Sequence, residues 1–175
     1  MKLIDKFIYA RSMKDIMCMM IASVLIWSVC SYLLKQKFQR NKEWCKCNVV
    51  LSGCMVLVIF GLTIASRNGE NMELILSPFH SFLEAQNQPE IYRSMLMNVF
   101  LFFPLGLTLP FALPEKWNRK ALITIVFAFI LSFAIEFLQF YYHLGRAETD
   151  DIFCNTLGAA IGTLSYKLER KFFAK

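Results

Sequence analysis

The chain has 175 residues, of which 57% are hydrophobic, and a formal net charge of +6 at pH 7. Soluble domains contain about 45–50% apolar residues, so this composition excludes an ordinary soluble domain and predicts that much of the surface faces lipid. The alternation of polar and apolar residues that a transmembrane β-barrel requires is not found either. The predicted fold class is therefore all-α, a polytopic membrane helix bundle.

Residues 1–15 are the first predicted segment. Leu3, Ile4 and Phe7 lie among four basic residues, a pattern typical of a short amphipathic helix on the membrane surface. A plain solvated tail is the alternative. No small-x-small cleavage site follows the first apolar run, so this run is expected to stay in the mature protein.

Five apolar stretches predict the membrane spans, because a spanning helix needs about 20 mostly apolar residues. The last stretch is the weakest, since it contains Asn155 and two glycines, and it is expected to depend on packing against other helices. The predicted spans are 16–34, 48–66, 95–113, 121–142 and 152–168.

The distribution of Lys and Arg predicts the orientation, because cytoplasmic loops collect basic residues. Five basic residues lie in 35–47, three in 114–120 and four from Lys167 onward, whereas 67–94 has two and 143–151 has one. The first three segments are therefore expected inside. Five spans then put the N-terminus outside, although it is basic too. An inside N-terminus is the alternative if the first stretch does not cross.

The long connection 67–94 is acidic and is expected to form a cap on the outer side. Its apolar part, 74–82, is suited to dip back into the membrane interface, with Pro78 interrupting any helix. A loop anchored by Phe79 and Phe82 is the alternative.

Glu136 lies inside the otherwise apolar stretch 121–142, about six residues or roughly 9 Å from its outer end. An ionisable side chain at that depth costs a few kcal/mol unless it is paired or hydrated, so it is expected to face the bundle interior and mark a functional site. Gln139 shares its helix face. The alternative is a buried glutamate that only joins two helices through hydrogen bonds.

The connection after this stretch brings further polar residues to the outer end. Asp150 or Asp151 is expected to cap the next helix, where a carboxylate accepts backbone N–H groups. Asn155 follows one turn after Asp151 on the same face. With Asn98 from the third stretch, these residues form a predicted functional polar cluster: Asn98, Glu136, Gln139, Arg146, Glu148, Asp151 and Asn155.

Four further residues are predicted to shape or pack the helices. Pro104 removes a helical hydrogen bond and is expected to bend its helix, and Gly106 permits a close neighbour. Gly158 and Gly162 form a G-x-x-x-G pattern, which predicts close approach of another helix.

The cysteines do not indicate a metal site. Four of the six lie in or beside apolar runs, where Cys behaves as a small hydrophobic residue. Cys45 and Cys47 form a single C-x-C without the second ligand pair of a tetrahedral zinc site, so no metal and no other cofactor is predicted. Cytoplasmic loops that face anionic lipid explain the net positive charge, so no nucleic acid partner is predicted.

At these motifs the chain resembles the VanZ-like family of bacterial membrane proteins. The match rests on LSPF at 76–79, NVFLFFPLG at 98–106, EFLQF at 136–140 and GRAETDDIFCNTLGAAIG at 145–162, in series over about residues 70–168. The resemblance carries over onto Asn98, Pro104, Gly106, Glu136, Gln139, Arg146, Asp151, Asn155 and Gly158, and the acid at Glu148 also fits.

The resemblance divides the chain into two N-terminal spans at 16–66, a VanZ-like domain at 67–168 and a basic cytoplasmic tail at 169–175. It implies a multi-pass protein of the bacterial plasma membrane that lowers susceptibility to lipoglycopeptide antibiotics such as teicoplanin at the outer face. The mechanism stays open. Expected partners are membrane lipids, with a lipid-linked cell-wall precursor or the lipoglycopeptide itself as ligand, and a homodimer is a further candidate assembly.

Two other functions are alternatives. One is a membrane enzyme acting on a lipid or lipid-linked envelope substrate, with Glu136 as general base, Arg146 binding phosphate and Asp151 orienting a group or holding Mg²⁺. The sequence favours a non-enzymatic role, because it lacks a Ser or Cys nucleophile paired with His, an H-E-x-x-H motif and a Gly-rich phosphate loop. The other is a small proton-coupled transporter that titrates Glu136, although no internal repeat is visible.

Overall fold

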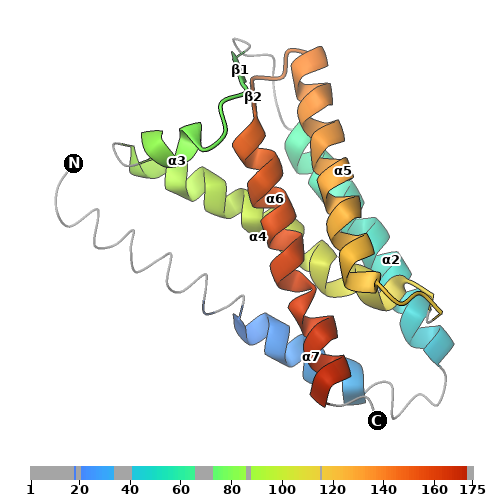
Figure 1. Cartoon of the computed structure of the whole chain (residues 1–175). Coiled ribbons are helices and arrows are strands. Elements are labelled where there is room, and N and C mark those ends of the chain that lie inside the picture. The colour runs from blue at the N-terminus through green and yellow to red at the C-terminus, as the bar shows by residue number, and fades with distance from the viewer. Residues whose placement is uncertain are drawn as a thin grey trace.

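The computed structural model describes residues 18, 21–33, 41–65, 73–85, 88–114 and 116–172. Within these residues, long helices pack side by side and two short strands lie at one end (Figure 1). The all-α class is confirmed. In the part of the chain that the structure describes, three helices are long and apolar enough to cross a membrane: Glu43–Ile64, Ile91–Ala112 and Lys120–Tyr141.

The elements follow the apolar runs of the sequence. A helical segment, Ile21–Leu33, comes first. The later elements are α2 (Asn41–Phe60), the π-helix η1 (Gly61–Ala65), β1 (Glu73–Ile75), α3 (His80–Glu84), α4 (Pro89–Ala112), α5 (Lys120–Tyr141), β2 (Arg146–Glu148), α6 (Thr149–Gly162) and α7 (Leu164–Phe172).

The predicted spans at the two ends of the chain are helical where the structure describes them. The first coincides with Ile21–Leu33, and the predicted interfacial segment 1–15 lies outside the described residues. The last is divided between α6 and α7 at Thr163. There the Thr163 hydroxyl donates to the Ala160 carbonyl at 2.7 Å, and such local side-chain bonds compete with the helical ladder.

The expected basic tail is partly helical. Residues 169–172 continue α7, and Glu169 within them is buried. Residues 173–175 lie outside the described residues.

Helix α4 is the central helix of the bundle, packed against α2, α5 and α6. Its side chains Phe102 and Leu105 are completely buried. The helix remains one element through Pro104, where the Thr108 hydroxyl donates to the Pro104 carbonyl at 3.1 Å. A second bond of Thr108, from Ser52 of α2 at 3.0 Å, joins the two helices.

The backbones of α4 and α6 touch at their glycines. A Cβ added to Gly158 would lie 2.0 Å from the carbonyl oxygen of Val99, and one added to Gly106 would lie 2.2 Å from that of Ala159. Gly162 meets α4 at Phe103 in the same way, at 2.4 Å. Residues without a side chain permit this approach, which brings the backbones into van der Waals contact.

The two ends of the bundle differ in character. At one end, called here the β1–β2 end, the strands pair in parallel, with Glu73 opposite Arg146 and Ile75 opposite Glu148. The other, called here the α7 end, holds an aromatic group in which Trp44 packs on Phe111 and Phe111 on Tyr166.

Large apolar side chains point outward along the helices. On α5, Ile130 is 59% exposed and Phe133 is 56% exposed, and on α2, Leu57 is 73% exposed. Water-soluble monomers rarely expose apolar patches of this extent. Together with the three spanning helices, these surfaces identify a membrane protein.

Candidate functional site

A tight reversal after α5 builds the candidate site. His143 and Gly145 adopt positive φ angles of 54° and 99°, and the Leu144 N–H donates back to the Gln139 carbonyl at 2.9 Å. The left-handed conformation suits Gly145 because it has no Cβ. The turn returns the chain along α5, so that β2 passes beside Glu136.

Glu136 is buried, with 8% of its surface exposed. Its Oε2 accepts the backbone N–H of Glu148 at 3.1 Å. A hydrogen bond of this kind offsets part of the cost of removing a carboxyl group from water.

The guanidinium of Arg146 lies between two carboxylates. Its Nη2 is 3.0 Å from Glu84 Oε2, and its Nε is 2.8 Å from Glu148 Oε1. The Ser81 hydroxyl donates to the other oxygen of Glu148. Arg146 therefore joins β2 to α3 through two ion pairs. These ion pairs use the guanidinium N–H groups that would otherwise bind a phosphate.

Asp150 is an acid that binds backbone N–H groups, but these belong to the start of α3 and not to α6, the helix that it was expected to cap. The α6 N-cap is Glu148, which makes no side-chain capping bond, so the prediction of a capping aspartate is wrong. The buried carboxylate of Asp150 instead accepts the N–H groups of Phe79 at 2.7 Å and Ser81 at 2.8 Å. Because Phe79 adopts a positive φ of 62°, the loop curls around this carboxylate.

Aromatic contacts hold the same loop on α6. The rings of Phe79 and Phe82 lie 6.1 and 6.3 Å from that of Phe153, measured between centroids. These contacts hold the loop on α6, while Leu76 and Leu83 remain exposed. Entry of 74–82 into the membrane interface stays a prediction.

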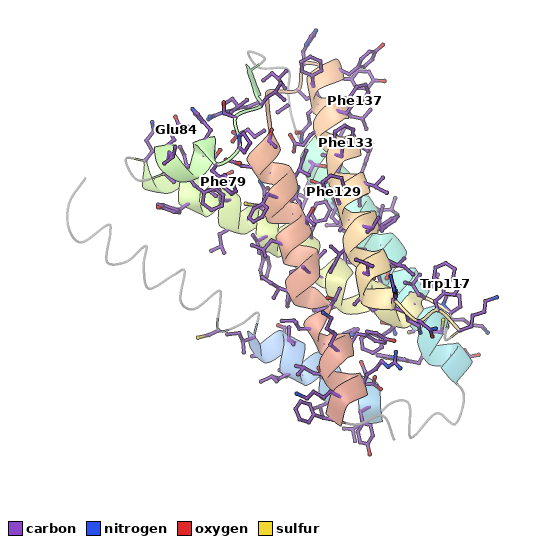
Figure 2. The ribbon with its side chains drawn as sticks, viewed as in Figure 1. Phe79, Glu84, Trp117, Phe129, Phe133 and Phe137 are labelled. Atoms are coloured by element: carbon purple, nitrogen blue, oxygen red, sulfur yellow. The ribbon has the colours of Figure 1, made fainter. Side chains whose placement is uncertain are left out.

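A pocket of about 170 Å³ opens beside Glu136. Figure 2 shows Phe129, Phe133 and Phe137 in a row along α5. All three are exposed, and Phe133 and Phe137 line the pocket. The pocket is mostly apolar, and its polar groups come from two acids and a threonine. Its lining residues are Leu74, Leu76, Phe133, Glu136, Phe137, Phe140, Ala147, Glu148, Thr149 and Ile152.

Two other predicted site residues join helices away from the pocket. The Gln139 amide donates to the carbonyl of Thr63 in η1 at 3.0 Å. The Asn155 amide, 2% exposed, donates to the Ser132 hydroxyl on α5 at 2.9 Å.

The structure thus brings Glu136, Arg146 and Glu148 into one network. Asp151 lies half-buried in the first turn of α6. Asn98 is half-buried on α4 beside the Gly158 contact, and no hydrogen bond among the described residues joins it to the network.

Sequence reasoning missed Ser81 and Glu84, and it named Asp150 only as a candidate cap of the next helix. The two acids were visible as charges, but no local spacing links residue 84 to residue 146. Among the described residues, no group of three or more His, Cys, Asp or Glu side chains is arranged to hold a metal ion.

Comparison with known proteins identifies a family and a relative. The family model described as VanZ/LLP1 matches residues 47–170, so the match includes most of α2 as well as the motif region. The chain is similar to Protein VanZ of Enterococcus faecium, with 32% identity over 80 residues, which cover 46% of this chain and 48% of the relative. The match thus spans about half the length of that curated protein. No solved structure matches.

Proposed function

The chain belongs to the VanZ/LLP1 family, and we propose that it lowers bacterial susceptibility to lipoglycopeptide antibiotics such as teicoplanin by binding an acylated ligand in the pocket beside Glu136. It acts as a multi-pass protein of the plasma membrane. The similarity to Protein VanZ supports the phenotype, and the chemistry of the pocket supports the mode of action.

One observation carries the proposal: a buried carboxyl group lies against an exposed aromatic wall. Glu136 is 8% exposed, whereas Phe133 and Phe137, which line the same pocket, are each 56% exposed. Ligand sites commonly combine apolar walls with a few polar groups that fix orientation. An acyl chain fits the aromatic wall, and a polar head reaches the carboxyl group.

The charged residues of the site indicate which polar group of a ligand could bind there. Two acids, Glu136 and Glu148, line the pocket, and the nearby cation Arg146 is already paired with Glu148 and Glu84. A phosphate would meet acceptor groups here, whereas an amine, amide or hydroxyl would donate to them. A lipoglycopeptide or the peptide part of a lipid-linked cell-wall precursor offers both an acyl chain and such donors.

The predicted orientation of the chain supports a position of this pocket at the outer face. The connections at the β1–β2 end, 67–94 and 143–151, carry few basic residues, and those at the α7 end carry many. Basic loops stay in the cytoplasm, so the pocket opens toward the outer leaflet, where the antibiotics and wall precursors meet.

Inhibitory concentrations in a susceptible strain test the proposal. Expression of the wild-type chain is expected to raise the teicoplanin inhibitory concentration with little change for vancomycin. Glu136→Gln should reduce this protection at unchanged membrane abundance, because an amide replaces the carboxyl group that is proposed to bind the polar head. Glu43→Gln is the matched control, because Glu43 is exposed and lies at the α7 end of the bundle, away from the pocket. Equal protection by the wild type and Glu136→Gln would rule out this role for the pocket.

A further inference from the structure

A basic groove lies at the α7 end, remote from the Glu136 pocket. Its volume is about 540 Å³, and it is formed between the start of α5 and the face of α7. We propose that this groove binds the phosphate headgroup of an anionic phospholipid, independently of the function proposed for the other end.

The charge of the groove points to an anion. Half of the described residues that line it are basic and none is acidic. Cations collected from two separate elements provide several donors to one phosphate, which a single surface lysine cannot do. The five are Arg119, Lys120, Lys167, Arg170 and Lys171.

Tyr166 organises two of these cations. The ring of this buried residue lies 5.7 Å from Lys120 Nζ and 5.9 Å from the guanidinium carbon of Arg170. Arg170 also donates to the Tyr166 hydroxyl at 3.3 Å. Lys120 is only 7% exposed. The fold therefore holds this cation inside the groove, whereas most lysines lie on the protein surface.

The backbone adds to the attraction. Helix α5 begins at Lys120, and the N-cap Arg119 supplies no side-chain capping bond. The first N–H groups of a long helix and its positive dipole end favour a negative charge nearby. These contributions reinforce the cations and are not required to define the groove.

The apolar part of the groove distinguishes a lipid from a soluble anion. Ala121, Leu122 and Ile125 continue the lining along α5, and Leu122 is 50% exposed. An acyl chain attached to the headgroup would lie along this face within the membrane. A free phosphate would use the cations alone, and the apolar extension would have no role.

Native mass spectrometry of the purified full-length chain tests the assignment. Phosphatidylglycerol and phosphatidylcholine with identical acyl chains compete for the protein, and the wild type should retain the anionic lipid preferentially. Lys167→Gln/Lys171→Gln removes two exposed cations without disturbing buried groups. We expect roughly fivefold weaker retention for each cation removed, or about 25-fold for the pair.

A charge-matched control separates a site from general attraction. Lys46→Gln/Arg93→Gln makes the same change in net charge at exposed positions outside the groove, and it should retain the lipid as the wild type does. An equal loss in both double variants overturns the proposal. So does displacement of the lipid by inorganic phosphate at the same concentration, because the groove would then be a soluble-anion site. Antibiotic protection is not a readout of this experiment, so its result is separate from the test of Glu136.

Discussion

The carboxylate of Asp150 accepts the backbone N–H of Ser81 at 2.8 Å, across 69 residues of the chain. The same carboxylate accepts the Phe79 N–H at 2.7 Å. These bonds fix the loop 76–81 against the first turn of α6, whose residues Thr149 and Ile152 line the pocket. The stability of the site therefore depends on this buried acid.

Asp150→Ala is expected to destabilise the protein by roughly 2–4 kcal/mol, since each buried N–H left without an acceptor costs about 1–3 kcal/mol. The midpoint of thermal unfolding in detergent, followed by tryptophan fluorescence, measures the loss. Asp151→Ala is the adjacent control, because Asp151 accepts neither of these two N–H groups. A larger loss for Asp151→Ala than for Asp150→Ala would contradict the assignment.

Gly158→Ala should separate α4 from α6, because its new Cβ would lie 2.0 Å from the Val99 carbonyl oxygen. Overpacking of this kind costs about 1–3 kcal/mol or more. Membrane abundance and unfolding midpoint should both fall. Gly53→Ala provides the matched control, since nothing lies within 4 Å of a Cβ there, and an exposed helical Gly→Ala change stabilises by up to about 1 kcal/mol. Similar midpoints for the two variants would contradict the close contact.

Phe133→Ala is expected to weaken ligand binding about tenfold or more, because burial of an aromatic side chain contributes roughly 1.5–3 kcal/mol. Protection against teicoplanin, normalised to membrane abundance, should decline accordingly. Phe129→Ala is the control, since Phe129 lies one turn earlier on α5 with similar exposure and does not line the pocket. Equal losses from both substitutions would indicate a general effect of the α5 surface.

Arg146→Gln leaves the carboxylates of Glu84 and Glu148 without the cation between them. A double-mutant cycle with Glu84→Gln should give a coupling free energy of about 1 kcal/mol, the upper range for partly exposed pairs. The free energies of unfolding of the wild type, the two single variants and the double variant give this coupling free energy. Strict additivity of the two changes would show that the ion pair contributes nothing to stability.

The long helices could be predicted because an apolar run of sufficient length has few other structures available in a membrane. The predicted stretch 121–142 differs from α5, Lys120–Tyr141, by one residue at each end. The position of Glu136 inside the apolar stretch 121–142 likewise predicted that its side chain is buried, and it is. Its functional role remains a prediction.

Contacts between distant segments could not be predicted in this way. Strands β1 and β2 have three residues each, and their pairing depends on the turn after α5 rather than on local propensity. The sequence could not choose between Asp150 and Asp151 either, because the partner N–H groups belong to another segment. The basic groove was missed for the same reason, since it joins the start of α5 to α7.

The parallel pairing of β1 with β2 has a consequence for how the protein is made. The ribosome completes β1 and the loop 76–81 before it begins α4 and α5. Their partners, β2 and the carboxylate of Asp150, are made only after α5. Until then, the N–H groups of Phe79 and Ser81 lack the Asp150 acceptor they have in the folded chain. The pocket can therefore form only after β2 and the start of α6 have been made, when both preceding helices have already been synthesised.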